Sequence, residues 1–238
     1  MFLDLANTKF FAYLPKIILP AVGSTLRMLF FSMVFGLILG TLTAIVLAIT
    51  SPYGLRPKPR FYKVASFLVN MVRSFPVIIL IVAISPLTRA LVGTSIGEKA
   101  AIVPLTLAAF PVIARYMETS LLEVDRSLVL AARSFGANTM QILFKVLFVE
   151  ALPSIISGLT TTAILFLAST TLAGAVGAGG LGAVALTYGY QGFDDVMMYA
   201  IVGILFIMVL LIQGVGELLY RKARYRKPKQ KGMSGHEI

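Results

Sequence analysis

The sequence predicts an all-α integral membrane protein with five transmembrane helices, on three observations. First, 58% of the 238 residues are hydrophobic and only 13% are charged, whereas a soluble domain is typically about 45–50% apolar and about 25% charged. Second, the apolar residues gather in uncharged runs of the length that a membrane-spanning helix needs, about 20 residues. Third, the basic residues concentrate on one side of these runs. A soluble enzyme domain and a disordered chain are therefore excluded.

The five predicted spans are residues 28–50, 62–84, 99–117, 154–173 and 196–216. The first and last of them are uncharged throughout. The second contains Arg73 and is expected to kink or end at Pro76, and the third is expected to do the same at Pro104 or Pro111. Residues 1–220 are thus assigned to one transmembrane domain and residues 221–238 to a basic cytoplasmic tail.

The longest uncharged run, residues 151–193, is predicted to hold one span rather than two. Five of the nine residues in 174–182 are glycine, which disfavours helix, and residues 183–193 are too few to cross a bilayer. We expect a re-entrant or interfacial segment here, covered by protein or lining a water-filled cavity. The G-x-G-x-x-G match at 177–182 follows no predicted strand, so close backbone packing is favoured over nucleotide binding.

The net charge of +11 is interpreted as membrane topology rather than as nucleic-acid binding. With five spans and an inner C-terminus, fifteen Lys and Arg fall on the inner segments and four on the outer segments. This asymmetry follows the positive-inside rule and predicts an N-out, C-in orientation in the lipid bilayer. Six spans would place the basic tail outside.

Several kinds of chemistry are excluded by the residues that the chain lacks. There is no cysteine and only one histidine, so a disulfide framework and a Cys- or His-based metal site are excluded. The dipeptide Gly-Lys does not occur, so there is no Walker A motif, and any ATP must be bound by another chain. No carboxylate is predicted in mid-membrane, which disfavours an ion-coupled carrier.

Two groups of residues are predicted to line a translocation pathway. Arg73 is either a pathway residue or a structural residue that bonds backbone carbonyls freed near Pro76. Span four ends in Ser169, Thr170, Thr171 and Leu172. Small polar groups suit a transient path, whereas ordinary helix packing by Ser and Thr is the alternative.

The longest inner connection, residues 115–153, is predicted to hold two short helices. The first begins after Asp125 and ends at Gly136, because glycine is favoured just past a helix C-terminus. Asn138 or Thr139 caps the second, residues 140–150. Such a protrusion either docks a cytoplasmic partner or is an interfacial connector.

This connection resembles the E-A-A-x3-G-x9-I-x-L-P signature of binding-protein-dependent ABC importer permeases. Ala131, Ala132 and Gly136 match it, with Val146 at the Ile position. The departures are Leu130, Phe148 and Val149, which stand where the signature has Glu, Leu and Pro. The segments RSFPVIIL (73–80), GTSIG (93–97), AAIVPLT (100–106), GAVGAGGLG (174–182) and YGY (188–190) narrow the resemblance to methionine-uptake permeases, over residues 24–213.

The resemblance implies the type I ABC importer permease fold in a bacterial cytoplasmic membrane. Two copies of the chain would form the pore. Two cytoplasmic ATPase subunits would bind Mg-ATP, and an extracytoplasmic binding protein would deliver methionine. The chain itself would catalyse no reaction and bind no cofactor. The resemblance gives the ATPase-coupling residues as Leu128, Ala131, Ala132, Arg133, Phe135, Gly136 and Ala137. It also gives Leu172 as an apolar gate.

The alternatives left open are a permease for another small amino acid, an ATP-independent secondary carrier and a membrane scaffold. The resemblance does not separate L-methionine from D-methionine.

Overall fold

The computed structural model describes residues 13–224 and is helical through most of that range. In chain order the elements are η2 (Leu14–Ile18), α2 (Leu19–Thr50), α3 (Pro59–Arg73), α4 (Val77–Ala83), α5 (Ser85–Val92), α6 (Glu98–Leu122), α7 (Arg126–Ser134), α8 (Thr139–Ile142), η3 (Leu143–Leu147), α9 (Phe148–Ala173), η4 (Gly174–Ala178), α10 (Gly180–Val184), η5 (Ala185–Tyr190) and α11 (Asp195–Arg224). By length and composition four helices could cross a membrane, or five if the bent pair α3–α4 counts as one. The all-helical fold is therefore confirmed, and the count of apolar passes reaches the expected five when α3 and α4 are taken as one.

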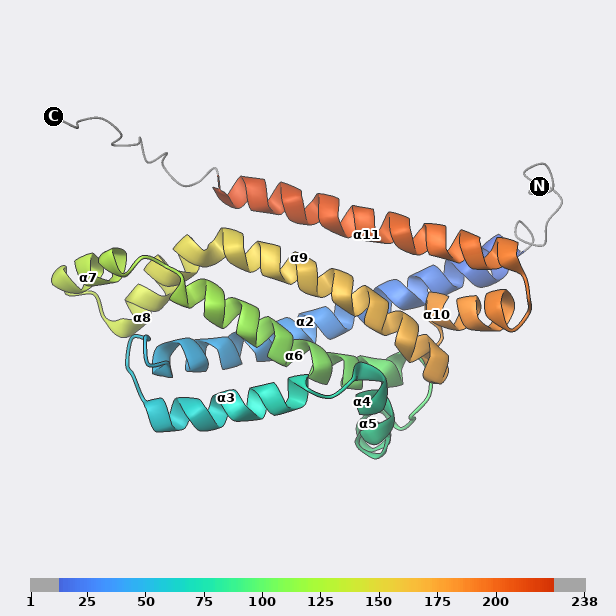
Figure 1. The fold of residues 1–238 in the computed structure, drawn as a ribbon, viewed down its shortest axis with the longest axis horizontal. Coiled ribbons are helices and arrows are strands. Elements are labelled where there is room, and N and C mark those ends of the chain that lie inside the picture. The colour runs from blue at the N-terminus through green and yellow to red at the C-terminus, as the bar shows by residue number, and fades with distance from the viewer. Residues whose placement is uncertain (1–12, 225–238) are drawn as a thin grey trace.

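The long helices alternate in direction along one axis, so the segments that connect them gather at two opposite ends of the molecule (Figure 1). We call them the α7 end, which holds α7, α8 and the last turn of α11, and the α10 end, which holds α10, α5 and the start of α2. The chain enters its described part at the α10 end and leaves it at the α7 end. An odd number of passes requires this separation of the two termini.

The first helix begins earlier than the uncharged run predicted. A continuous helix extends over Leu14–Thr50, whereas residues 28–50 were expected. Lys16 and Arg27 lie inside it. A charge keeps a segment away from the hydrocarbon core but does not interrupt backbone hydrogen bonding. An uncharged run therefore indicates the embedded part of a helix and not its ends.

The second predicted span, residues 62–84, is broken into two helices. The axes of α3 and α4 differ by 93°, and Pro76 lies between them as the N-cap residue of α4. Because proline has no amide hydrogen and crowds the preceding turn, it ends α3 as expected. In contrast, Pro104 and Pro111 lie within α6 and do not end it. Of the two expected effects, a kink or an end of the helix, the second is therefore wrong for these prolines.

The fourth span and the helix expected at residues 140–150 are one element. The elements α8, η3 and α9 form one helix over residues 139–173, and the helical conformation breaks at Val176 and Gly177 inside η4. The expected separation near Pro153 is wrong, because the helix continues through this proline, which lies in its interior and removes one backbone hydrogen bond there. Likewise α11 continues past residue 216 to Arg224, so the first residues of the predicted tail are helical. The rest of the tail lies outside the described residues.

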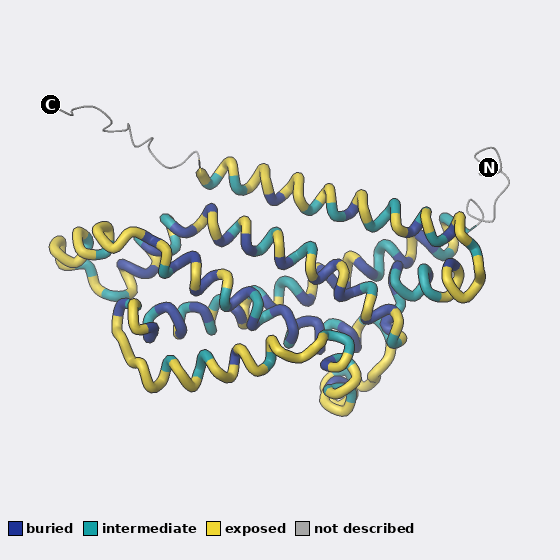
Figure 2. The backbone as a smooth tube through the Cα atoms, viewed as in Figure 1, coloured by how far each residue is buried: buried dark blue, intermediate teal, exposed yellow. Residues whose placement is uncertain are grey.

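The core is formed mainly where α2 packs against α6 and α9 (Figure 2). Gly36 and Gly40 allow α2 to approach α6 closely. A Cβ atom at Gly40 would lie 2.9 Å from the carbonyl oxygen of Phe110, and one at Gly36 would lie 2.8 Å from Cβ of Ala109. Small residues four apart are typical of helix contacts in membranes. This G-x-x-x-G pair was visible in the sequence and was missed.

Candidate functional site

The protrusion at the α7 end is built by local capping interactions. Asp125 accepts a hydrogen bond from the amide of Ser127 at 2.8 Å and so caps α7. Gly136 ends the helix with φ +81°, the left-handed conformation in which glycine is favoured. Asn138 and Gln141 form a reciprocal capping box at the start of α8. The predicted stop at Gly136 is confirmed, and of the two candidate caps Asn138 is the one used.

The capping bond lowers the pKa of the Asp125 carboxyl, first because the backbone amide of Ser127 donates to it and then because the Ser127 side chain does. Hydrogen bonds to the charged form of a carboxyl favour that form. The cap is therefore ionised at neutral pH, and its negative charge lies beside the positive end of the α7 dipole.

The seven predicted coupling residues fall on two sides of α7 and the following turn. Leu128, Ala131 and Phe135 are exposed, and Phe135 is 91% exposed. Ala132 and Ala137 are half-buried and pack against the core. The remaining two are structural as well: the guanidinium of Arg133 donates to the carbonyl of Leu55 at 2.8 Å, and Gly136 makes the turn.

Leu130, which stands where the signature has Glu, is 63% exposed on α7. Leu128, Leu130 and Phe135 are therefore large apolar side chains that this chain leaves exposed, among exposed polar residues such as Ser127 and Ser134. Exposed apolar side chains on a capped helix are typical of a protein interaction site.

A polar groove of about 680 Å³ lies between the C-terminal end of α3 and the helices α6 and α9. Arg73, Arg115 and Glu123 supply its charges. Its other lining residues are Val112, Tyr116, Thr119, Ser120, Ser154, Ser157, Gly158, Thr161 and Leu165. Arg73 is exposed as the last residue of α3 and lines this groove, as a pathway residue would.

The polar residues predicted at the end of span four do not line the groove. Ser169 and Thr170 are buried, and their hydroxyls donate to the carbonyls of Leu165 and Leu167 in the same helix. Thr171 is half-buried and bonds in the same way to Ala168. Within one chain the packing alternative therefore describes Ser169 and Thr170 better than a pathway role.

Leu172 differs from its neighbours because it is 46% exposed. It continues a single exposed face of α9 formed by Ser154, Ser157, Thr161, Leu165, Ala168 and Leu172. Their spacings of three and four residues place them on one side of a helix. This face is polar beside the groove and becomes apolar towards the α10 end.

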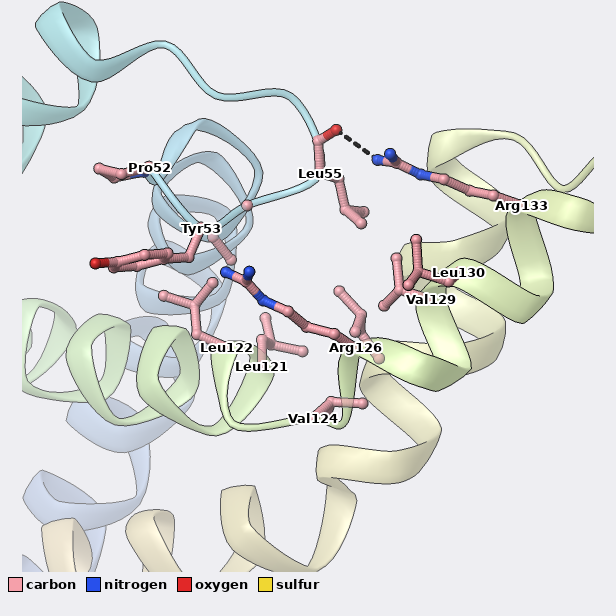
Figure 3. Close-up of a pocket in the computed structure, with 13 residues that line it drawn as sticks. Pro52, Tyr53, Leu55, Leu121, Leu122, Val124, Arg126, Val129, Leu130 and Arg133 are labelled. Carbon is pink, nitrogen blue, oxygen red and sulfur yellow. Dashed lines mark hydrogen bonds between the residues drawn. The ribbon is translucent and has the colours of Figure 1, made fainter.

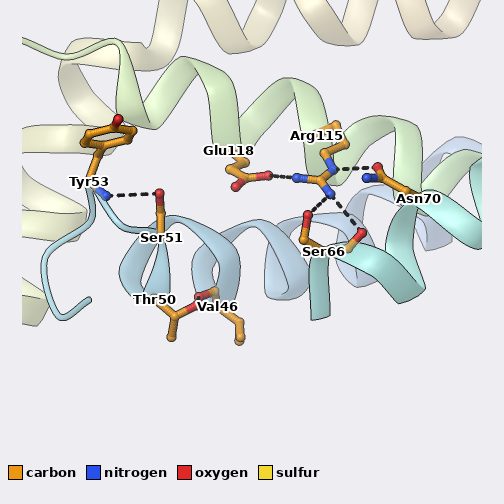
Figure 4. A network of polar contacts seen from close by, with 8 residues as sticks. All are labelled: Val46, Thr50, Ser51, Tyr53, Ser66, Asn70, Arg115 and Glu118. Carbon is orange, nitrogen blue, oxygen red and sulfur yellow. Dashed lines mark hydrogen bonds and ion pairs between the residues drawn. The ribbon is translucent and has the colours of Figure 1, made fainter. Parts of the chain in front are cut away.

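A largely buried ion pair within α6 lies beside the groove, and its arginine also bonds to α3 (Figure 4). Arg115 pairs with Glu118 at 2.7 Å, and its guanidinium also donates to the carbonyl of Ser66 at 2.9 Å and to Oδ1 of Asn70 at 3.2 Å. Glu118 is only 3% exposed. Both residues were assigned to an inner loop beginning at 115, which is wrong because α6 extends to Leu122. Their i,i+3 spacing was the available signal.

The glycine-rich segment is held at the α10 end by backbone interactions. The amide of Gly97 donates to the carbonyl of Gly177 at 3.0 Å, and the amide of Leu181 donates to Oγ1 of Thr25 at 2.9 Å. A Cβ atom at Gly182 would lie 2.2 Å from the carbonyl oxygen of Thr171. The glycines therefore allow close packing, as predicted, and no strand precedes them within residues 13–224.

Comparison with known proteins agrees with this geometry. Residues 36–225 match the family described as "Binding-protein-dependent transport system inner membrane component". The chain is 40% identical over 218 residues to a probable D-methionine transport system permease protein MetI of Vibrio cholerae, covering 92% of this chain and 97% of that one. It is 43% identical over 175 residues to the methionine import system permease protein MetP of Bacillus subtilis, covering 73% and 78%.

A solved structure, an inward-facing conformation of the MetNI methionine ABC transporter, contains a similar chain. The two share 42% identity with a TM-score of 0.85, over 87% of this chain and 96% of the other. An amino acid ABC transporter chain at 20% identity and a TM-score of 0.70 supports the fold alone. This chain thus belongs to the family of inner-membrane components of binding-protein-dependent transport systems.

Proposed function

We propose that this chain is the membrane-spanning permease subunit of an ATP-driven methionine importer. The observation that carries the proposal is the capped α7 protrusion, on which this chain leaves the apolar side chains of Leu128 and Phe135 uncovered. The names of the V. cholerae and B. subtilis relatives support methionine as the substrate. The chain takes no part in ATP chemistry in this proposal, because separate ATPase subunits bind Mg-ATP.

The proposed assembly contains two copies of this chain, two cytoplasmic ATPase subunits and an extracytoplasmic methionine-binding protein. The positive-inside distribution supports an orientation in which the α7 end faces the cytoplasm. Each ATPase would cover Leu128 and Phe135. The groove beside Arg73 would then face the second copy and form part of the path, with Leu172 as a gate nearer the α10 end.

The long helix formed by α8, η3 and α9 suggests how the ATPase drives the pore. This helix, residues 139–173, begins beside the protrusion and ends at the glycine-rich segment, and a helix of this length spans about 50 Å. Closure of the ATPase dimer would move α7, and this helix would carry the movement to the α10 end. The chain would thus exchange between inward- and outward-facing states that its partners favour differently.

Uptake of labelled methionine by the reconstituted complex tests the proposed substrate. We expect ATP-dependent uptake that unlabelled methionine suppresses and other small amino acids do not. Suppression by a different amino acid would identify another substrate. Uptake without ATPase subunits would instead indicate a secondary carrier, and absence of any uptake would favour a scaffold.

The docking role of the protrusion is tested by a matched pair of glycine variants. Gly136→Pro and Gly93→Pro each replace a glycine in the left-handed region, at φ +81° and +83°, and each removes one backbone hydrogen bond. Only Gly136 lies at the protrusion. We expect Gly136→Pro to abolish ATPase co-purification and uptake, while Gly93→Pro retains the ATPase subunits. If both variants retained the ATPase subunits equally well, the docking assignment would be contradicted.

A further inference from the structure

A second cavity lies behind α7, between this helix and the loop that joins α2 to α3 (Figure 3). Its volume is about 280 Å³. Aliphatic side chains form its walls: Leu55 comes from the loop, Leu121 from the end of α6, and Val129 from α7. The cavity is therefore apolar inside, although it lies at the end of the bundle and not in its core.

Two guanidinium groups point towards this cavity from α7. The Arg126 group lies 5.3 Å from the ring centroid of Tyr53 and makes no hydrogen bond in the described part of the chain. Arg133 donates to the carbonyl of Leu55, and a guanidinium has five N–H donors, so it retains donors for a ligand. None of the lining residues is acidic. The complementary ligand is an anion attached to an apolar group.

The depth of the cavity identifies the source of that ligand. Its lining includes Ala48 in the last turn of α2 and Val124 just beyond the end of α6. The uncharged run that begins within α2 ends at Leu55 and the basic loop begins at Arg56, which places this level where the hydrocarbon layer gives way to the phospholipid headgroups. Basic pockets at this level on the cytoplasmic side bind anionic lipid headgroups. Three more basic residues, Arg56, Lys58 and Arg60, lie in the same loop or at the start of α3.

We propose that this cavity binds an anionic phospholipid of the inner leaflet, with the phosphate held by Arg126 and Arg133 and an acyl chain against the aliphatic wall. This inference rests on the proposed orientation. The bound lipid would connect α7 to the loop after α2, and so it would hold the ATPase-docking helix in a fixed position relative to the span bundle. Coupling between ATP hydrolysis and transport would then depend on anionic lipid.

Lipid binding is measured directly on the assembled complex, in nanodiscs of phosphatidylcholine with or without phosphatidylglycerol. Native mass spectrometry of the released complex counts the phosphatidylglycerol molecules that each variant retains as the lipid is titrated. One cationic residue near an anionic surface contributes about fivefold in affinity. We therefore expect about fivefold weaker retention in Arg126→Gln and wild-type retention in Arg126→Lys.

Arg60→Gln is the control for surface charge, because Arg60 is exposed at the start of α3 and does not line the cavity. It should weaken retention less than Arg126→Gln does, and equal losses in the two variants would assign the effect to general surface charge. A second readout is the number of methionine molecules imported per ATP, which should fall in phosphatidylcholine alone and in Arg126→Gln.

Three results would overturn the lipid site. In the first, the complex retains phosphatidylcholine as strongly as phosphatidylglycerol. In the second, Arg126→Gln retains phosphatidylglycerol as strongly as the wild type does. In the third, inorganic phosphate displaces the lipid completely, which would assign the cavity to a soluble anion. Loss of ATPase subunits instead of lipid from Arg126→Gln would assign it to an acidic group of the ATPase. Because uptake by the wild-type complex is measured separately, failure of the lipid site leaves the proposed function intact.

Discussion

The Arg115–Glu118 ion pair shows how one buried contact can stabilise a bundle of apolar helices. Isolated ionisable groups are costly away from water, so they persist where each satisfies the other. Glu118 depends on this partner strongly, since its Oε1 atom has no hydrogen-bond partner among the described residues. The pair also fixes α3 against α6 through Ser66 and Asn70.

Removing one member of this pair should destabilise the protein severely. Arg115→Leu leaves the Glu118 carboxylate buried and unpaired, which costs about 3–5 kcal/mol. Arg115→Leu combined with Glu118→Leu should recover most of that loss. Thermal unfolding of the purified complex measures both. Glu217→Gln, in the exposed pair Glu217–Arg221, should change stability by only about 0.3–0.5 kcal/mol.

The cap of α7 should respond to pH through Asp125. Because its pKa is lowered in the folded protein, the cap stabilises α7 fully above the ordinary pKa of an aspartate. That stabilisation is lost as the pH falls through the lowered, folded-state pKa. Hydrogen exchange of residues 126–134 in wild type and in Asp125→Asn measures the effect. The two should converge as acid is added, and a constant difference down to strongly acidic pH would contradict the assignment.

At the scale of helices, the contact between α2 and α6 depends on two glycine residues, which have no side chain to separate the helices. Gly36 and Gly40 bring two backbones together, and the neighbouring Ile113 fills the space that remains. Without a hydrophobic driving force between helices in lipid, such close van der Waals packing is what joins them.

Enlarging Gly40 should separate these helices. In Gly40→Val the new Cβ would meet Cγ2 of Ile113 at 2.8 Å, and overpacking of this kind costs about 1–3 kcal/mol. Gly203 in α11 has no atom within 4 Å of its would-be Cβ, so Gly203→Ala should be neutral or slightly stabilising. Thermal unfolding compares the two, and a Gly40→Val variant as stable as Gly203→Ala would contradict the close contact of α2 with α6.

At the scale of the whole molecule, the two ends differ in what they expose to partners. Phe135 at the α7 end is 91% exposed and Phe193 near the α10 end is 92% exposed. With no cysteine in the chain, these two positions allow a clean test of orientation.

Single cysteines at these positions should label from opposite sides of the membrane. In intact cells an impermeant thiol reagent should modify Phe193→Cys, whereas Phe135→Cys should react only after the membrane is permeabilised. The reverse pattern would overturn the N-out, C-in orientation. Labelling of both variants from outside would indicate that the chain crosses the membrane an even number of times, or not at all, between residues 135 and 193.

The sequence by itself determined the number of apolar passes, the break in the glycine-rich segment and the ends of α7. These depend on local properties: the length of an uncharged run, the left-handed conformation at Gly136, and the capping side chains of Asp125 and Asn138. The residues that match the importer signature also indicated the family.

Only the tertiary structure decided which face of each helix is buried in the bundle and which face is exposed. Ser169 and Thr170 were expected on a path and lie in the core, whereas Thr161 and Leu165 line the groove. In a membrane helix the lipid-facing and protein-facing sides are both apolar, so sequence periodicity carries little information about orientation. For the same reason the 93° bend after α3, the burial of Glu118 and the arginine-rimmed cavity behind α7 emerge only when distant segments pack together.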